Sequence, residues 1–119
     1  MTSEWKNLAP ELVRQRVIIE GTTDHVVNEE EIIDYLWELS KVVDMRPLQK
    51  PYAYPAEEMG YGGWIHWVTS GAHFYSYTTT IPFFSVDAYT CKPFNVQDAV
   101  DFTAKYFNTS DIVFKEVPV

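Results

Sequence analysis

Residues 60–91 read GYGGWIHWVTSGAHFYSYTTTIPFFSVDAYTC, and aromatic and β-branched residues dominate this stretch. Residues of these types fit the pleated, half-buried surface of a sheet. The run is interrupted at Ser70-Gly71-Ala72 and again at Ile81-Pro82, where turn-forming residues occur. The stretch therefore predicts three consecutive antiparallel strands, over residues 61–70, 73–80 and 83–91.

Two helices are predicted on either side of this stretch. Asn28 caps the first, because Glu31 follows three residues later as in a capping box, and the apolar pattern extends that helix over residues 29–44. Asn95 caps the second helix, which runs over residues 95–107. Each helix has one apolar stripe, so each is expected to pack one face on a sheet.

Three further segments complete the predicted sheet. Residues 13–20 contain the β-branched run Val17-Ile18-Ile19 of a buried strand, and residues 112–117 form the last strand. Residues 45–55 contain three prolines, so they predict an edge strand or an extended loop. The order β-α-β-β-β-β-α-β predicts an α/β fold of the α+β two-layer sandwich type, a mainly antiparallel sheet with two helices on one face.

Length and composition limit the class of protein. The 119 residues, 46% of them hydrophobic, suffice for a single domain over 1–119, with residues 1–11 as an N-terminal arm. The formal net charge of -8 argues against nucleic-acid and membrane partners, because both need clustered Lys and Arg. A single cysteine, Cys91, leaves no internal disulfide and favours a cytoplasmic location, and neither a signal peptide nor a membrane span is expected.

Side chains that could carry chemistry gather in the central strands. Alternation along a strand predicts that Trp64, His66, Val68 and Ser70 share one face, and that His73, Tyr75 and Tyr77 share a face of the next strand. Strands favour aromatic and hydroxyl residues in any case, so a purely structural role stays open for each. No His-x-His or Cys-x-x-Cys spacing is present, so no metal site is expected.

Cys91 has two interpretations. It precedes Lys92 and lies before a helix N-terminus, and both features would lower the pKa of its thiol, so a reactive or proton-donating cysteine is one interpretation. A small buried hydrophobic residue is the other.

A family resemblance rests on a few segments. Gly60-Tyr61-Gly62-Gly63 opens a strand that leads to Thr69-Ser70, and a later strand ends in the pattern Asp87-x-x-Thr90-Cys91. Together these segments resemble the prokaryotic S-adenosylmethionine decarboxylase family, of which the chain looks like a diverged member. The resemblance implies pyruvoyl-dependent chemistry, in which a Glu-Ser bond cleaves itself and the serine becomes a pyruvoyl group that acts as an electron sink. It also implies a link to polyamine biosynthesis and a homodimer.

The resemblance implies catalytic roles for two residues. Ser70 matches the pyruvoyl serine when positions are counted from the glycines, and Cys91 matches the family's proton-donating cysteine. Counting back from Cys91 places the serine position at Gly71 instead, and a one-residue insertion at residues 79–82 reconciles the counts in favour of Ser70. The glutamate before the serine is replaced by Thr69.

The family's processing histidine is also replaced. Its position falls on Tyr75 or Ser76, and neither side chain is a ready proton shuttle at neutral pH. His73 lies on the same strand face as Tyr75 and is the candidate for a displaced histidine role.

These departures favour a protein without the standard decarboxylase activity, which acts as a small-ligand-binding protein or as a partner subunit. Its ligand is expected to be a small cation or a nucleoside, and no cofactor is expected while the chain stays uncleaved. The expected pocket contains catalytic positions Ser70, His73 and Cys91, substrate-binding residues Trp64, Tyr75 and Ser76, and Trp67 and Phe94 as further stacking rings.

Two alternatives remain open. One is an active pyruvoyl-dependent decarboxylase that cleaves itself at Thr69-Ser70, with its pyruvoyl group from Ser70, Cys91 as the acid and His73 as the processing residue. The other is a structural protein that assembles through its aromatic surface.

Overall fold

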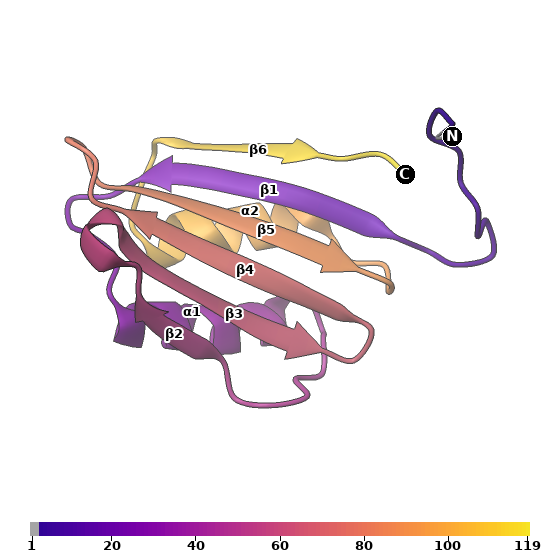
Figure 1. The fold of residues 1–119 in the computed structure, drawn as a ribbon, viewed down its shortest axis with the longest axis horizontal. Helices are drawn as coiled ribbons and strands as arrows, with labels where there is room; N and C mark the ends of the chain where they lie inside the picture. The colour runs from indigo at the N-terminus through magenta and orange to yellow at the C-terminus, as the bar shows by residue number, and fades with distance from the viewer. Residues whose placement is uncertain (1–2) are drawn as a thin grey trace.

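The computed structural model describes residues 3–119, which form one six-stranded sheet and two helices (Figure 1). The strand order is β2-β3-β4-β5-β1-β6, and every neighbouring pair is antiparallel. Along the chain the elements are β1 (Gln15–Thr22), α1 (Glu29–Val42), β2 (Tyr52–Pro55), the 3-10 turn η1 (Glu57–Met59), β3 (Gly60–Trp67), β4 (Ser70–Tyr77), β5 (Phe83–Thr90), α2 (Val96–Tyr106) and β6 (Ile112–Glu116).

The predicted fold class is confirmed. The order β-α-β-β-β-β-α-β is observed, and both helices cover the same face of the sheet (Figure 1). We call the face under the helices the inner face and the opposite face the outer face. No helix of the described residues covers the outer face, so side chains there meet solvent.

Helix α1 begins as its sequence predicts. The backbone N–H of Glu31 donates to Asn28 Oδ1 at 3.0 Å, and the backbone N–H of Asn28 donates to Glu31 Oε1 at 3.2 Å, which completes the capping box. The helix ends at Val42, two residues before the predicted end, because Asp44 adopts a left-handed backbone conformation with φ of 55°.

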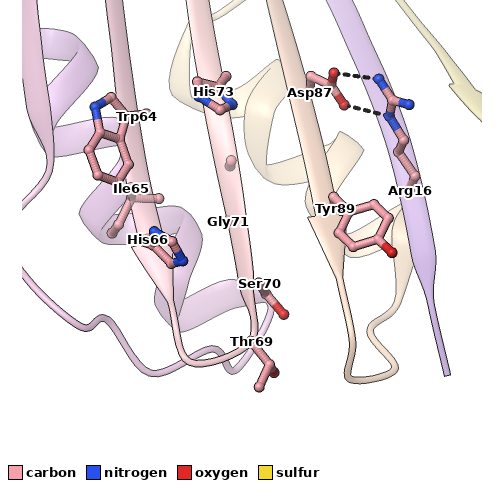
Figure 2. Close-up of a pocket in the computed structure, with 11 residues that line it drawn as sticks. Arg16, Trp64, Ile65, His66, Thr69, Ser70, Gly71, His73, Asp87 and Tyr89 are labelled. Atoms are coloured by element: carbon pink, nitrogen blue, oxygen red, sulfur yellow. Dashed lines mark hydrogen bonds and ion pairs between the residues drawn. The ribbon is translucent and has the colours of Figure 1, made fainter. Parts of the chain in front are cut away.

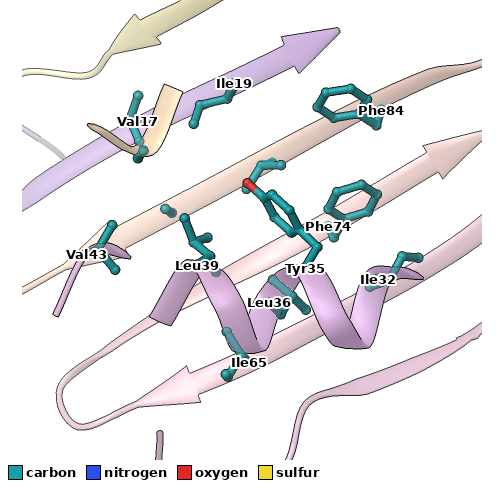
Figure 3. Close-up of a cluster of buried hydrophobic side chains, with 14 of the residues drawn as sticks. Val17, Ile19, Ile32, Tyr35, Leu36, Leu39, Val43, Ile65, Phe74 and Phe84 are labelled. Atoms are coloured by element: carbon teal, nitrogen blue, oxygen red, sulfur yellow. The ribbon is translucent and has the colours of Figure 1, made fainter. Parts of the chain in front are cut away.

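The core lies between α1, α2 and the inner face (Figure 3). The predicted stripe of α1, including Ile32, Leu36 and Leu39, is buried. Tyr35 is also fully buried, which the apolar pattern alone did not predict. Its hydroxyl lies 2.7 Å from Thr103 Oγ1 on α2, so the buried polar group is satisfied and joins the two helices.

The turn between β3 and β4 lies elsewhere than predicted. Strand β3 ends at Trp67, and Ser70 pairs with Trp67 as the first residue of β4, so the turn consists of Val68 and Thr69. Gly71, predicted within the break, lies inside β4 opposite Tyr89. The prediction failed because the β-branched pair Val68-Thr69 resembles strand sequence, although Thr69 has φ of 65°.

The proline-rich segment gives only a short strand. Strand β2 has four residues and forms one edge of the sheet, as the prolines of residues 45–55 predict.

The segment before β1 is held by a turn in which Leu12 N–H donates to the Ala9 carbonyl at 2.9 Å. Within the part of the chain that the structure describes, no helix is long and apolar enough to cross a membrane.

Candidate functional site

The outer face of the sheet is rich in aromatic side chains. Tyr52 on β2 stacks on Trp64 of β3 with ring centroids 5.4 Å apart, and His73 stacks on Tyr75 within β4 with centroids 6.2 Å apart. Each of these residues alternates with an inward-pointing neighbour, which is why they share one side of the sheet. The predicted common face of His73, Tyr75 and Tyr77 is confirmed.

A hollow of about 380 Å³ opens on this outer face at the end of the sheet nearest the β3–β4 turn (Figure 2). Four strands contribute its walls. The lining side chains that carry rings or charges are Trp64, His66, His73, Asp87, Tyr89 and Arg16.

The floor of the hollow is Gly71. The strand register places Gly71 between His66 on β3 and Tyr89 on β5, so a residue without a side chain separates two large rings. A Cβ atom at Gly71 would have only one close neighbour, the Ile65 carbonyl oxygen at 3.1 Å. The space above Gly71 is therefore open because this residue lacks a side chain.

One end of the hollow is closed by an ion pair across β1 and β5. Arg16 Nε donates to Asp87 Oδ1 at 3.0 Å and Arg16 Nη2 donates to Asp87 Oδ2 at 2.8 Å. The hydrogen bonds to Asp87, followed by the attraction of its charge, raise the pKa of Arg16 above its usual value. The guanidinium is therefore held charged and in a fixed orientation.

Ser70 does not lie where alternation predicted. Because β3 ends at Trp67, Ser70 falls on the inner face with Trp67 rather than on the outer face with Trp64 and His66. Its side chain is buried, and its Oγ accepts a hydrogen bond of 3.0 Å from the backbone N–H of Cys91. The structure thus brings Ser70 and the backbone of Cys91 together, and although Ser70 and His73 alternate to opposite faces of β4, both line the hollow.

Ser76 and Trp67 also lie on the inner face. Ser76 is buried, and its hydroxyl donates to the Val27 carbonyl at 2.8 Å, which ties β4 to the segment before α1. Trp67 is fully buried, and its indole N–H donates to Ser40 Oγ at 2.8 Å. Neither side chain shares a face with Tyr75, so the predicted pocket divides between the two sides of the sheet. Phe94 packs against the core rather than beside Trp64.

The surroundings of Cys91 differ from those that the sequence suggested. Cys91 is partly exposed, and the ammonium group of Lys92 lies 3.0 Å from Asp44 Oδ2 and 2.6 Å from the Asp44 carbonyl. The Lys92 charge is therefore engaged with Asp44. Helix α2 begins only at Val96, with its cap at Asn95.

Thr90 is a polar residue near Ser70 that the sequence did not single out. The register that pairs Gly71 with Tyr89 places Ser70 opposite Thr90, both on the inner face. Thr90 is 1% exposed, and its Oγ1 has no hydrogen-bond partner. An unsatisfied buried hydroxyl costs free energy, so this end of the sheet is not optimised for stability alone.

Arg16, Gly71 and Tyr89 are site residues that the sequence reasoning missed. The sequence does contain a pattern that could have identified Arg16. This charged residue directly precedes the apolar run Val17-Ile18-Ile19, and strand alternation places its side chain on the outer face. Its pairing with Asp87 depends on the packing of β1 against β5 and has no local signal. Within residues 3–119, no group of three or more His, Cys, Asp or Glu side chains is placed to hold a metal ion.

Comparison with known proteins agrees with this fold. A sequence model of the S-adenosylmethionine decarboxylase family matches residues 17–118, and the chain therefore belongs to that family. The crystal structure of the adenosylmethionine decarboxylase from Aquifex aeolicus VF5 is similar, with a TM-score of 0.68 and 18% sequence identity over 89% of each chain. A comparison with curated protein sequences gave no match.

Proposed function

We propose that this protein is a diverged S-adenosylmethionine decarboxylase-like protein that binds a small nucleoside ligand without self-processing. The observation that carries the proposal is the hollow over Gly71, which is open on the outer face and bordered by rings on three strands. A concave site with aromatic walls and a few fixed polar groups is typical of small-molecule binding.

The rings suit a nucleoside base. Trp64 and Tyr89 are large planar side chains, and His66 and His73 add two imidazoles whose nitrogens can donate or accept hydrogen bonds. A purine needs both a stacking surface and hydrogen-bonding groups at its edges. The family description names S-adenosylmethionine, a nucleoside, which makes it the first ligand to test.

The surroundings of Ser70 support the absence of self-processing. Thr69 stands before Ser70 where the family resemblance implies a glutamate, and Tyr75 or Ser76 stands at the histidine position. His73 alternates to the outer face of β4 and Ser70 to the buried inner face, which argues against His73 as a replacement for that histidine, although both residues line the hollow. The residues present therefore do not fit a pyruvoyl group formed by the family's usual route.

Intact mass under denaturing conditions tests this part of the proposal. A single species near 13.8 kDa is expected for freshly purified protein. Two fragments that meet at the Thr69–Ser70 bond, with the second lacking its amino group, would overturn it.

A pocket-filling substitution tests the binding site. Gly71→Val places a branched side chain in the hollow and should weaken S-adenosylmethionine binding by at least about tenfold in calorimetry, which corresponds to about 1.4 kcal/mol. Gly62→Val is the matched control, since Gly62 lies on the outer face of β3 with ordinary contacts to Tyr54 and outside the hollow. Circular dichroism establishes that both variants are folded, and unchanged affinity in a folded Gly71→Val variant would place the ligand elsewhere.

An active pyruvoyl-dependent decarboxylase is the second candidate. Two observations favour it: Thr69 has a left-handed φ of 65° directly before Ser70, and the backbone N–H of Cys91 donates to Ser70 Oγ at 3.0 Å, which places residue 91 beside Ser70. A β-branched residue is strained in that conformation, and such strain is often stored at functional sites. Detection of a ketone at the N-terminus of a fragment beginning at residue 70, together with CO₂ release from S-adenosylmethionine, would establish this activity.

We further propose a homodimer in the cytoplasm, carried over from the family resemblance and the single cysteine. The exposed tyrosines of the outer face support a dimer, because contiguous exposed aromatic surface is typical of protein interfaces. Tyr54 and Tyr75 lie in the cross-strand row beyond the hollow, which leaves the hollow itself available to a ligand.

A further inference from the structure

We infer that residues 3–14, the segment before β1, form a strap that closes over the hollow and completes the binding site with Trp5 and Leu8. The inference rests on the proposed ligand-binding function and gives the site a second wall. The nucleoside ligand lies in the hollow, and the strap covers it from the solvent side.

The hollow by itself covers only one side of a ligand. All of its lining residues belong to strands of the sheet or to the β3–β4 turn, and no helix of the described residues covers that face. Small-molecule sites bury most of the surface of their ligand. Tight binding on this face therefore requires a covering element.

The strap carries large apolar side chains that have no core to pack on. Trp5 is 73% exposed and Leu8 is 80% exposed. The core, with the side chains packed against it, includes none of residues 3–14. Because burial of large apolar side chains is favourable, closure over the rings of the hollow stabilises the closed form.

The hydrogen bonds divide the chain into strap and body between Arg14 and Gln15. Within the described residues, the strap bonds only to itself: the Ala9 N–H and Arg14 Nη2 donate to Asn7 Oδ1. Gln15 is instead fixed to the body, where its Oε1 accepts from the Phe94 N–H at 2.9 Å and its Nε2 donates to the Phe94 carbonyl at 3.2 Å. The strap can therefore turn about this point as a unit without breaking a hydrogen bond to the body.

This hinge lies at the end of the sheet where the hollow opens. Gln15 pairs with Thr90, and the lining residue Ser70 lies opposite Thr90 on the next strand, two strand spacings or about 10 Å from Gln15. Leu8 precedes Gln15 by seven residues, which span up to about 23 Å when extended, and Trp5 lies further out. Both side chains can therefore reach over the hollow. Figure 1 shows the strap leaving β1 at the same end of the sheet as the β3–β4 turn.

The charge of the strap permits this closure. Its charged residues are two acids and two bases, Glu4, Lys6, Glu11 and Arg14, so its formal net charge is zero. The rest of the chain therefore carries the whole formal charge of -8. A strap without net charge is not repelled by that surface.

Substitutions in the strap of the full chain test the inference by calorimetry with S-adenosylmethionine. Trp5→Ala combined with Leu8→Ala should weaken binding at least about tenfold, mainly through faster dissociation, because the cover is lost. Trp5→Phe alone should stay within about threefold of the wild-type affinity, since it keeps an aromatic side chain at the same position. Glu11→Gln, at an exposed position of the same strap, is the matched control and should change the affinity less than about twofold. Circular dichroism establishes that each variant is folded.

Trypsin measures the position of the strap directly. Lys6 is exposed within the strap, whereas Arg46, Lys50 and Lys92 each precede a proline, where trypsin cleaves poorly. Saturating S-adenosylmethionine should slow cleavage after Lys6 at least about tenfold in the wild-type protein, because proteolysis follows the population of the open form. The same ligand, at saturation, should give little protection in the Trp5→Ala Leu8→Ala variant.

A mixture of two variants shows whose strap covers the hollow. The Trp5→Ala Leu8→Ala chain keeps an open hollow, and the Gly71→Val chain keeps an intact strap. After refolding together, the mixture should bind no more tightly than the separate variants. Recovery of wild-type affinity in the mixture would overturn closure within one chain and assign the strap to the hollow of a second copy.

Failure of the strap and failure of the proposed function give different results. Wild-type affinity in the folded Trp5→Ala Leu8→Ala variant, or no protection of Lys6 in the liganded wild-type protein, overturns the strap and leaves nucleoside binding standing. Absence of S-adenosylmethionine binding by the wild-type protein overturns the proposed function, and the strap with it.

Discussion

The conformation of Thr69 is the clearest source of strain at the residue scale. Its φ of 65° lies in the left-handed region, which is unfavourable for a residue with a branched Cβ. Thr69→Gly should therefore raise the free energy of unfolding by about 1 kcal/mol, measured by urea denaturation.

Val68 is the control for this prediction. It lies in the same two-residue turn without a positive φ, so Val68→Gly relieves no strain and should lower stability through added chain entropy. Equal effects of the two substitutions would contradict the strain at Thr69.

His25 predicts a pH-dependent contribution to stability. Its Nδ1 lies 2.6 Å from Asp24 Oδ1 and its Nε2 lies 2.7 Å from Glu31 Oε2, and these two hydrogen bonds, that of Asp24 first, raise the pKa of His25. Because the pKa of His25 is higher in the folded state, protonation of His25 stabilises the folded protein. This stabilisation is complete below the unfolded pKa of about 6.5, and it is lost as the pH rises through the folded pKa. The half-exposed side chain limits the effect to about 1 kcal/mol or less.

The measurement compares wild-type protein with His25→Gln by urea denaturation from about pH 6 to about pH 9. The difference in free energy of unfolding between them should shrink as the pH rises. A difference that stays constant would show that protonation of His25 does not contribute.

At the residue scale, local patterns predicted some side chains well and others on the wrong face. The Asn28 capping box was predicted because its two hydrogen bonds join residues three apart in sequence. Ser70 was misplaced because its direction depends on where the turn begins, and a shift of one residue moves a strand side chain to the opposite face.

Substitutions at two glycines of β3 test how closely α1 packs on the sheet. A Cβ atom at Gly63 would collide with the Ile32 side chain and come within 2.7 Å of the Tyr52 carbonyl oxygen, whereas one at Gly62 would meet only the Tyr54 ring at 3.8 Å or more. Gly63→Ala should lower the free energy of unfolding by about 1–3 kcal/mol, because overpacking forces neighbours to move.

Gly62→Ala provides the matched comparison in thermal or urea unfolding. It should be neutral or slightly stabilising, since alanine restricts the unfolded chain more than glycine does. A neutral Gly63→Ala variant would mean that α1 adjusts its position easily.

At the scale of elements, the helices were more predictable than the strand boundaries. Each helix has a cap and an apolar stripe, two independent signals that agree. The β3–β4 turn has neither glycine nor asparagine at its positive-φ position, so its sequence lacks the usual turn signal.

At the scale of the whole molecule, the uncovered outer face predicts self-association. Sedimentation should give a mass about twice the 13.8 kDa of the chain. Tyr54 is 54% exposed, and Tyr54→Lys should weaken the dimer at least about tenfold, because a two-fold axis repeats the new charge in both subunits.

Val42→Lys on the helical layer is the control and should leave the mass unchanged. A wild-type monomer at high protein concentration would refute the dimer. Dissociation by Val42→Lys but not by Tyr54→Lys would place the interface on the helices.

The fold as a whole was predictable, whereas the assembled site was not. Element order and face alternation are local properties, and they suffice for a two-layer sandwich. The hollow requires β1 to lie beside β5, which brings together Arg16 and Asp87 from positions 71 residues apart in the sequence. Strand register across such distances carries no signal in a single sequence.

The floor of the hollow also has a genetic consequence. A glycine codon is one nucleotide change away from codons for larger residues, including valine, and a Cβ atom at Gly71 would have one close neighbour, the Ile65 carbonyl oxygen at 3.1 Å. One point mutation can therefore fill the hollow. One reversion empties it again, so this feature of the surface can be lost and regained in single steps.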